Sequence, residues 1–531
     1  MRKPSLGLGL AVALAVAAPA TAQTITKLVP GSAFKGIHGI KFAPSGELYA
    51  GSVVGQTLYG VNVDTGAIRV IEKPPEGMAD DVAFGPGGQV VWTSISAGLV
   101  HSRIGKGPVT VLAKDMPGAN SIAFSRDGKR LFLGQVFAGD GVWELDPKGI
   151  KPPRAITGPV GGFNSFAPGP DGMLYGPLWF KNQVAKINPD TGSVTVVADG
   201  FKTPAAAKFN SKNVLYVIAT ESGELFAVDI KTGTKTKVAQ LSSSLDNIAV
   251  NRQDRVFVSN MADNGIQEVN LKTGALRQVV PGGGLAIPAD IAVTSKDGHD
   301  TLYVADVFAY RSVDGTTGKV TDIARAHGPT HLDYPTGVSV SGNSVYLAGV
   351  ATGTVQVFDQ TTGKSTALLS DFKAPSDAIM MPNGALMVAE INAGNLIQVR
   401  GDVRTVLRSG LKGPAGLALA ADGSILVAEI DAGRITKVDP ATGVSTTFAE
   451  GLNRPKAIAV TTSGQVLVLE VGARRIIEID PKTGAFKPVT GILPVGFPTQ
   501  PGLTGAGIAV GETGVIYLAS DVENAIYKIT R

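Results

Sequence analysis

The chain has 531 residues, of which 44% are apolar and 17% are charged, and its formal net charge is +4. This length and composition are typical of a folded protein with more than one buried core, and they exclude a disordered chain. No long basic run is present, which argues against a nucleic-acid-binding surface. The chain has no cysteine, so disulfides, thiolate metal sites, iron–sulfur clusters and a cysteine nucleophile are excluded.

Residues 1–22 have the form of a secretory signal peptide. Arg2 and Lys3 are a short basic segment, residues 6–18 are apolar, and small residues ending at Ala22 form a cleavage pattern. A membrane anchor is the alternative, but this apolar stretch is shorter than the about 20 residues that span a bilayer. We therefore expect cleavage near Ala22 and a mature protein without a membrane span, either periplasmic or secreted.

The rest of the chain repeats one unit of roughly 40 to 45 residues. Short alternating runs rich in Val, Ile, Leu and Tyr lie between turns that contain glycine, and each unit has four such runs. Four antiparallel strands in a unit of this length predict the blade of a β-propeller, so the fold class is all-β. The Thr-Gly turn that marks the units recurs at Thr65, Thr191, Thr232, Thr273, Thr317, Thr362, Thr442 and Thr483.

Twelve units fit after the signal peptide, and propellers usually have four to eight blades. The sequence therefore predicts two tandem six-bladed β-propellers, residues 23–274 and 275–531; a seven-plus-five division is the alternative. The last unit stops after its third strand, and residues 24–29 form an extra strand before the first unit. Because closure of a ring protects its strand edges, we expect each ring to be closed by an earlier strand, with 24–29 completing unit six and 276–280 completing unit twelve.

Two of the units carry a family resemblance. Residues 410–443, GLKGPAGLALAADGSILVAEIDAGRITKVDPATG, and 451–484, GLNRPKAIAVTTSGQVLVLEVGARRIIEIDPKTG, resemble NHL repeats. Among propellers of this kind, the chain is most similar to the six-bladed SMP-30/gluconolactonase proteins, paraoxonases and streptogramin lyases. The resemblance implies a divalent metal on Asn, Asp and Glu side chains in a central channel. The Glu that opens the first blade of SMP-30-like proteins is replaced here by His38, followed by Gly39.

The first residues of the innermost strands form a ring around each channel. In the first propeller five of the six positions are polar, namely His38, Asp80, Asn120, Asn164 and Asp246, and the sixth is Ala205. Carboxylates in a narrow channel need a cation, a proton or water to compensate them. We therefore predict one divalent cation, Ca²⁺ or Mg²⁺, held by Asn120, Asn164 and Asp246, with His38 and Asp80 as catalytic base or further ligands. The alternative is a water-filled channel with only structural hydrogen bonds.

Trp179 falls in a loop on the same face as this ring, where we expect it to wall a small-molecule pocket. Trp92 and Trp143 lie in strands and are expected in the core. His327 and His331 resemble a His-x3-His metal motif, but Gly328 and Pro329 between them argue against a helix, so we expect an exposed loop.

Five acidic residues of the second propeller recur after its second strands. They are Asp306, Glu390, Glu429, Glu470 and Asp521, and Arg434 and Arg474 follow two of them. Repetition in every blade indicates a structural role, in which each carboxylate accepts loop amides or pairs with Arg.

Two functions follow from these patterns. In the first, the N-terminal propeller is a metal-dependent hydrolase of a lactone or ester, or a lyase, acting on a small molecule. In the alternative, both propellers are a non-catalytic NHL-like scaffold that binds a protein, a glycan or a small ligand. The polar ring is confined to one propeller, which favours the enzyme. No G-x-S-x-G elbow or phosphate loop supports serine-hydrolase or nucleotide chemistry.

Overall fold

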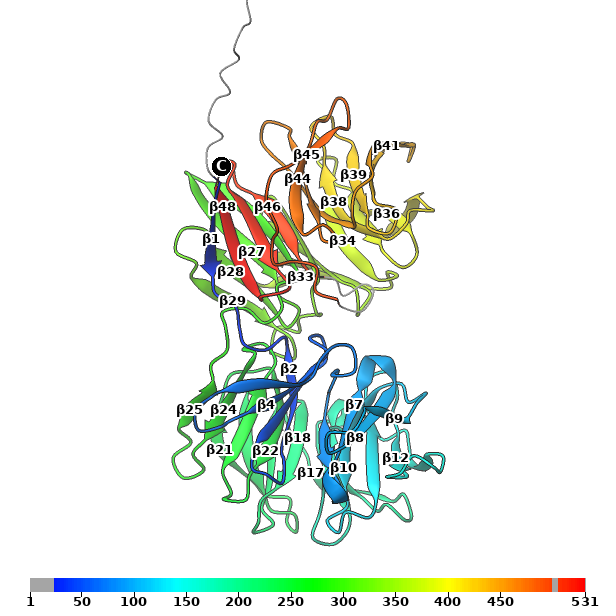
Figure 1. Ribbon diagram of the computed structural model, residues 1–531, viewed down its shortest axis with the longest axis vertical. Helices are drawn as coiled ribbons and strands as arrows, with labels where there is room; N and C mark the ends of the chain where they lie inside the picture. The colour runs from blue at the N-terminus through cyan, green and yellow to red at the C-terminus, as the bar shows by residue number, and fades with distance from the viewer. Residues whose placement is uncertain (1–22, 499–504, 531) are drawn as a thin grey trace, which may run out of the picture.

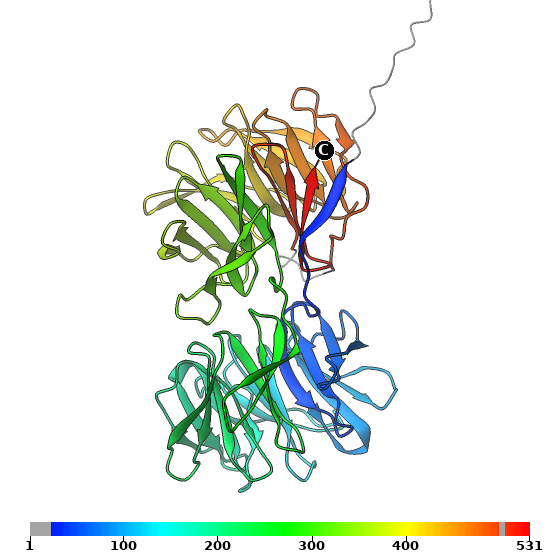
Figure 2. The same cartoon turned by 90° about the vertical axis from the view of Figure 1, so that its left-hand side faces the viewer.

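The computed structural model describes residues 23–498 and 505–530. These residues form twelve four-stranded antiparallel sheets, which confirms the predicted all-β class and the four-stranded units. Figures 1 and 2 show two lobes, one holding β2 to β25 and the other holding the later strands. The signal-peptide prediction concerns residues 1–22 and lies outside the described part of the chain.

The first lobe holds six of these sheets, formed by consecutive strands, and three short 3₁₀ helices. Its elements are β2 (Ile37–Phe42), β3 (Leu48–Ser52), β4 (Thr57–Val61), β5 (Ile68–Glu72), β6 (Val82–Phe84), η1 (Pro86–Gly88), β7 (Gln89–Ser94), η2 (Ile95–Ala97), β8 (Leu99–Ile104), β9 (Thr110–Ala113), β10 (Ala119–Phe124), β11 (Leu131–Gln135), β12 (Val142–Leu145), β13 (Arg154–Thr157), β14 (Ala167–Pro168), β15 (Leu174–Leu178), η3 (Trp179–Lys181), β16 (Gln183–Ile187), β17 (Val194–Ala198), β18 (Pro204–Phe209), β19 (Leu215–Ala219), β20 (Glu224–Val228), β21 (Lys235–Gln240), β22 (Leu245–Val250), β23 (Val256–Asn260), β24 (Gly265–Val269) and β25 (Leu276–Val280).

The second lobe holds the other six sheets, and its last sheet includes the first strand of the chain. Its elements are β1 (Thr24–Val29), β26 (Asp290–Lys296), β27 (His299–Ala305), β28 (Ala309–Asp314), β29 (Val320–Arg325), β30 (Gly337–Ser341), β31 (Ser344–Gly349), β32 (Thr354–Asp359), β33 (Ser365–Leu369), β34 (Pro375–Met380), β35 (Leu386–Glu390), β36 (Asn395–Arg400), β37 (Val403–Arg408), β38 (Pro414–Leu419), β39 (Ile425–Glu429), β40 (Arg434–Val438), β41 (Ser445–Glu450), β42 (Pro455–Val460), β43 (Val466–Glu470), β44 (Arg475–Ile479), β45 (Phe486–Pro488), β46 (Gly507–Val510), β47 (Ile516–Ser520) and β48 (Ala525–Thr530).

The Thr-Gly pairs form the turn between the third and fourth strands of a sheet. In the first sheet the Asn62 side-chain oxygen accepts the backbone N–H groups of Asp64 and Thr65, at 3.0 and 3.1 Å. Gly66 follows with φ +74°, a left-handed conformation that glycine adopts without steric cost. An Asn or Asp at the position of Asn62 accepts these backbone N–H groups and fixes the turn. The repeated Thr-Gly pair therefore predicts a hairpin in each unit that carries it.

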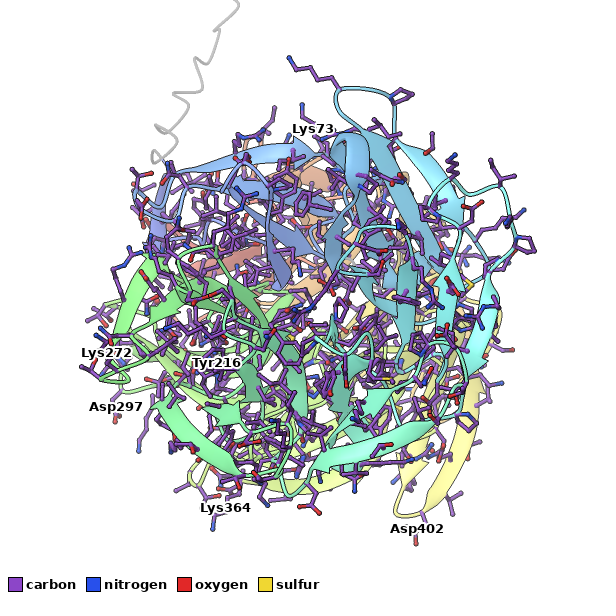
Figure 3. The ribbon with its side chains drawn as sticks, turned by 90° about the horizontal axis from the view of Figure 1, so that it is seen from below. Lys73, Tyr216, Lys272, Asp297, Lys364 and Asp402 are labelled. Atoms are coloured by element: carbon purple, nitrogen blue, oxygen red, sulfur yellow. The ribbon has the colours of Figure 1, made fainter. Side chains whose placement is uncertain are left out.

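Within each lobe the innermost strands contact one another in a closed order. In the first lobe β2, β6, β10, β14, β18 and β22 are successive neighbours, and β22 also contacts β2. In the second lobe β26, β30, β34, β38, β42 and β46 are successive neighbours, and β46 also contacts β26. Seen from below in Figure 3, the sheets of the first lobe surround a centre, their colours running from blue through cyan to green. Each lobe therefore has a central channel lined by first strands.

The predicted exchange of outer strands is wrong. Strand β1 pairs with β48, with Ile25 opposite Ile529, and completes the last sheet of the chain. Strand β25, residues 276–280, stays beside its own hairpin partner β24. The physical reason is local: β24 and β25 are joined by a tight Thr-Gly turn, so the first lobe already has four strands in every sheet. Only the last unit lacks a fourth strand, and β1 supplies it. The predicted boundary at 274/275 would separate β24 from β25.

The two lobes pack against each other around the two segments that connect them. Residues 30–36 lead from β1 to the first lobe, and residues 281–289 lead back. Lys35 donates from Nζ to the carbonyl oxygens of Asp521 and Val522 at 2.7 and 2.6 Å. An apolar cluster joins Met261 of the first lobe to Ile287 and Phe308 of the second. The lobes are thus held by buried apolar surface as well as by two chain crossings.

The pairing of β1 can be tested with two matched substitutions. Val29 and Val280 are both 2% exposed, but Val29 packs in the second lobe and Val280 in the first. A buried carboxylate is strongly unfavourable, so Val29→Asp should destabilise the second lobe by about 3 kcal/mol or more. Hydrogen exchange should then speed up in β48 for Val29→Asp and in β24 for Val280→Asp. Faster exchange in β24 of Val29→Asp would contradict the observed pairing.

Candidate functional site

A cavity of about 380 Å³ lies where the channel of the first lobe opens toward the second lobe. Its floor comes from the inner strands of the first lobe, and its roof from the loops that follow β27, β29 and β31. Aromatic and aliphatic side chains form most of the wall. The lining residues are His38, Val53, Val54, Asp80, Ile95, Ser96, Asn120, Phe137, Asn164, Trp179, Asp246, Met261, Val307, Phe308, His327, Tyr334, Ala351 and Thr352.

The structure brings all six sequence-predicted site residues into this one cavity. His38, Asp80, Asn120, Asn164 and Asp246 line the floor, and Trp179 lines the wall. Each floor residue lies at or just before the start of an innermost strand, where the predicted ring places it. Their chemical roles stay predictions.

A close approach of two strands places His38 beside Asp80. The backbone N–H of Gly39 donates to the carbonyl oxygen of Asp80 at 2.7 Å. A Cβ atom at position 39 would lie 2.0 Å from that oxygen, so only glycine fits there. This explains the glycine that directly follows His38.

Four floor side chains have no hydrogen-bond or ion-pair partner among the residues that the structure describes. They are Asp80, Asn120, Asn164 and Asp246. Polar groups that lose water on folding are normally paired, because leaving them unpaired costs free energy. Four such groups around one cavity indicate a surface that receives its partner from solution, whether water, an ion or a ligand.

The carboxyl groups of Asp80 and Asp246 hold protons more tightly than ordinary aspartates. Burial raises the pKa of both, and the negative charges around them raise it further: Asp246 and Asp81 act on Asp80, and Asp81 acts on Asp246. The ammonium of Lys208 opposes the shift at Asp246. At neutral pH the pair is therefore partly protonated, and its charge responds to a bound cation or proton donor.

His38 presents a defined acceptor to the cavity. Its Nδ1–H donates to the carbonyl oxygen of Gly36 at 3.0 Å, which leaves Nε2 unprotonated in the neutral ring. Burial lowers the pKa of His38 to about 4, so the ring is neutral in the physiological range. Its Nε2 can therefore accept a hydrogen bond, bind a metal or take a proton.

The roof contains a histidine that the sequence places in an exposed loop, and for His327 that expectation is wrong. His327 is half-buried over the cavity, edge-on to Trp179 at 4.9 Å between ring centroids, and its Nε2 pairs with the Tyr334 hydroxyl. Burial lowers its pKa to about 4. The loop is not a helix, as predicted, and His331 is exposed and does not line the cavity. His327 is covered because the second lobe docks against the first.

Tyr334 is the site residue that sequence reasoning missed. Burial raises the pKa of its hydroxyl, and the charges of Asp246 and Asp80 raise it further, so the phenol stays neutral near the carboxyl pair. Tyr334 lies in a loop between two sheets of the other lobe, and no repeated pattern marks it. The His-x3-His motif that shortly precedes Tyr334 in the chain is the one sequence pattern that draws attention to this segment.

Trp179 forms part of the wall and contacts the roof through His327. It opens the short helix η3, is 7% exposed and contacts Phe137 edge-on at 5.5 Å. Trp92 is fully buried, as expected, and donates from Nε1 to the Glu76 carbonyl at 2.9 Å. Trp143 packs against a core cluster of the first lobe. Trp179 is thus the one tryptophan that lines the cavity.

Backbone strain gathers around the cavity. Phe137, Val307, His327 and Tyr334 have φ values of +67°, +42°, +53° and +35°. Bulky and β-branched side chains rarely adopt this left-handed region, and such residues cluster at functional sites. All four line the cavity.

The floor residues are of the types that bind divalent cations, but their carboxyl and imidazole groups alone do not form a complete ligand set. Two carboxylates, two amide oxygens and one imidazole nitrogen suit Ca²⁺ or Mg²⁺ or, through His38, a transition metal. Within the described residues, however, no group of three or more His, Asp or Glu side chains is placed to hold a metal ion. Asn120 and Asn164 would have to complete the ligand set.

The channel of the second lobe differs because its carboxylates are already paired. Asp290 accepts the Val338 amide at 3.0 Å, and Asp377 accepts the amides of Ala378 and Leu417 at 2.8 and 2.7 Å. Backbone groups of the same lobe thus satisfy both carboxylates. Unpartnered carboxyl groups are a feature of the first channel, whereas the buried Lys456 lines the second.

The acidic series of the second lobe is structural, as predicted. Glu429 accepts the Lys412 amide at 2.6 Å and pairs with Arg434 at 2.7 Å. The other four carboxylates likewise accept loop amides. One detail is corrected: Glu470 pairs with Arg475, not Arg474, because the β43–β44 register places residues 470 and 475 opposite each other.

Comparisons with known proteins match this fold but do not fix a family. A protein-family model described as outer membrane protein assembly factor BamB matches residues 181–409, which is less than half of the chain. The search of curated proteins found no match. The NHL and SMP-30 resemblance has no counterpart among these matches and stays a prediction.

Two similar solved structures are extracellular domains from B. thetaiotaomicron, one described as part of a one-component system and the other of a hybrid two-component system. Both are 12% identical to this chain, covering 96% of it and 82% of their own length, with TM-scores of 0.32 and 0.34. At these scores they carry no argument about function. Separately, no helix among the described residues is long and apolar enough to cross a membrane.

The raised pKa values of the carboxyl pair predict a pH-dependent stability. Between pH 6.5 and 8 the folded protein retains protons that the unfolded chain has released, so these groups make stability fall as pH rises. Asp80→Asn removes one titrating group, so it should stabilise the protein, and the gain should grow toward pH 8. His38 and His327 titrate below this window. Lys208, with a pKa lowered to about 8, loses its proton earlier in the folded protein than in the unfolded chain, so it opposes the trend near pH 8 in both proteins compared below.

The measurement is urea unfolding at several pH values from 6.5 to 8. Asp402→Asn is the control, because Asp402 is exposed at the edge of the molecule (Figure 3). An Asp80→Asn protein with the same slope against pH as the Asp402→Asn protein would show that the pair is ordinarily ionised.

Proposed function

We propose that the chain consists of two tandem six-bladed β-propellers that bind a small molecule in the cavity between them. The closed order of innermost strands supports six blades in each ring. The strand pairing supports a first propeller of residues 37–280 and a second of residues 24–29 with 290–530. The match of residues 181–409 to the BamB model is in keeping with propeller repeats.

The unpartnered floor is the observation that carries the binding function. Asp80, Asn120, Asn164 and Asp246 aim polar groups at one cavity, and no described residue satisfies them. The volume of about 380 Å³ lies within the range of small-molecule sites. Because the second lobe covers the channel mouth, a small ligand fits this site better than a protein or a glycan chain.

The chemistry of the lining selects the ligand. Two carboxyl groups and the Nε2 of His38 accept hydrogen bonds, whereas Trp179, Phe137 and Phe308 offer aromatic surface. An amine held against aromatic faces and carboxylates gains both a cation–π and a charge-assisted contact. We therefore assign the site to a small molecule with an amine or hydroxyl-rich end and an apolar body.

We infer that the protein acts outside the cytoplasm. The basic, apolar and small-residue segments of residues 1–22 support export to the periplasm or the medium. Binding of a small molecule without turnover fits this location and requires no cofactor.

A second candidate function is a metal-dependent hydrolase or lyase acting on a lactone or ester in the same cavity. One observation favours it: an unprotonated His38 nitrogen and carboxyl groups with raised pKa values share the cavity, which provides a base and an acid. A divalent cation on Asn120, Asn164 and Asp246 would supply Lewis acidity when bound.

Tryptophan fluorescence can test ligand binding, because Trp179 alone among the three tryptophans lines the cavity. Phenethylamine and choline should change the emission with a saturable dependence. Asp246→Asn should weaken binding at least about 10-fold, since it removes a carboxylate partner. Trp179→Phe should abolish the signal and Trp143→Phe should keep it. No saturable change with either amine, in the native protein, would sink the amine assignment.

Metal content separates the two candidates. If the channel is catalytic, the purified mature protein should retain about one Ca²⁺ or Mg²⁺ per chain by plasma mass spectrometry, and Asn120→Ala should lose it. The melting temperature should also rise with the bound ion, because a ligand of the folded state stabilises it. Equal melting temperatures with chelator and with either ion would leave only the binding function.

A further inference from the structure

The channel of the first lobe has a second opening, on the face turned away from the second lobe. Figure 3 views the molecule from this side. A hollow of about 580 Å³ lies there, bordered by the turns that follow the innermost strands β2, β18 and β22. It shares no lining residue with the cavity between the lobes.

Three residues beyond the polar ring, a second ring has an unusual composition. It contains Lys41 in β2 and Lys208 in β18, and the equivalent residues of the other four blades are alanines. The alanines are Ala83, Ala123, Ala167 and Ala249. Small residues leave the channel open at this level, so the two long lysine side chains extend into it. The second lobe has no lysine at the equivalent positions, 292, 339, 379, 418, 459 and 509.

The two ammonium groups are poorly compensated. Lys208 has a side chain only 6% exposed; its Nζ donates to the Phe166 carbonyl at 3.1 Å and lies 3.9 Å from a carboxylate oxygen of Asp81. No described residue accepts a hydrogen bond from the Lys41 ammonium. The buried Lys208 and the half-buried Lys41 therefore face one buried carboxylate, which already accepts the amides of Val82 and Ile122.

The rim of the hollow adds further positive charge. Arg126 is held over it by hydrogen bonds to the Pro168 carbonyl at 3.1 Å and the Asn213 side chain at 3.0 Å. Arg252 is exposed on the opposite turn. Among the described residues that line the hollow, four are cationic and none is acidic. Such an arrangement is costly unless an anion occupies it.

We propose that this hollow binds a small oxyanion, sulfate or phosphate, between the ammonium groups of Lys41 and Lys208. A dianion matches the surplus of positive charge better than a monocarboxylate does. Charge-assisted hydrogen bonds from the two ammonium groups hold it, and the guanidinium groups of Arg126 and Arg252 attract it at the entrance. The site shares no lining residue with the small-molecule cavity, so the two proposals can be tested separately.

Calorimetric titration of the full mature chain with inorganic sulfate, inorganic phosphate and acetate tests the site. Sulfate and phosphate should bind, and acetate should bind at least about 10-fold more weakly. Lys41→Gln should weaken sulfate binding at least about 10-fold. Lys212→Gln is the matched control, because Lys212 is exposed on a neighbouring turn and does not line the hollow.

Different results would contradict different parts of this proposal. Failure of the native protein to bind sulfate or phosphate would overturn the site, as would an equal loss in Lys41→Gln and Lys212→Gln, which indicates unspecific attraction. Equal binding of acetate would overturn the assignment to a dianion. Lys208 is more deeply buried, so Lys208→Met serves as a second variant whose folding is checked first by its unfolding transition.

The pH dependence of sulfate affinity tests independently whether the two lysine ammonium groups hold the anion. Burial lowers the pKa of Lys41, and burial together with Lys41 lowers the pKa of Lys208 to about 8. The carboxylates of Asp81 and Asp246 oppose the shift at Lys208, and Arg126 and Arg252 lie at the rim. Sulfate affinity should therefore fall as pH rises from 7 to 9, because deprotonation removes the ammonium charge. A constant affinity would show that the arginines alone hold the anion.

Discussion

The pairing of β1 with β48 is the constraint on which the rest of this structure depends. Because the first strand completes the last sheet, the chain must leave the second lobe at residue 30, build the whole first lobe, and return near residue 281. Two crossings at one interface hold the lobes face to face. Asn264 of the first lobe and Asn524 of the second both donate to the Phe34 carbonyl of the crossing segment. A pair of lobes joined by a single linker would not keep a roof over the first channel.

The features that recur in every repeat unit could be predicted from the sequence. The ring residues from His38 to Asp246 recur at one position of each unit, so finding the period was enough to place them around one channel. The acidic series of the second lobe was predicted for the same reason, since its carboxylates serve identical loops in successive blades. Features tied to the period need no knowledge of long-range packing.

The strand that closes the second ring and the roof over the cavity both depend on contacts between distant parts of the chain. The first was predicted wrongly from the sequence, and the second was not predicted. Both extra strands have the same alternating pattern, but only residues 276–280 directly follow a Thr-Gly turn, at Thr273, and this local signal was overlooked. The decisive fact is that β25 already follows β24 through a tight turn. Tyr334 and His327 reach the site only because one lobe docks on the other, and the local sequence around His327 indicates only a loop. The metal and catalytic roles stay predictions, because a set of residue types does not fix a ligand geometry.

The two ends of the first channel are linked through one buried carboxylate. Asp81 lies between the polar ring and the lysines; its charge raises the pKa of Asp80 and Asp246 and supports the ammonium of Lys208. Protons at the mouth and at the far end therefore belong to a single network of carboxyl and ammonium groups. A channel that only filled the centre of a propeller would be most stable with apolar side chains or with paired carboxylates, such as Asp290 and Asp377 of the second lobe. The first channel instead has carboxyl and amide groups at one opening and the ammonium groups of Lys41 and Lys208 at the other, a separation that suits the two openings to different classes of ligand.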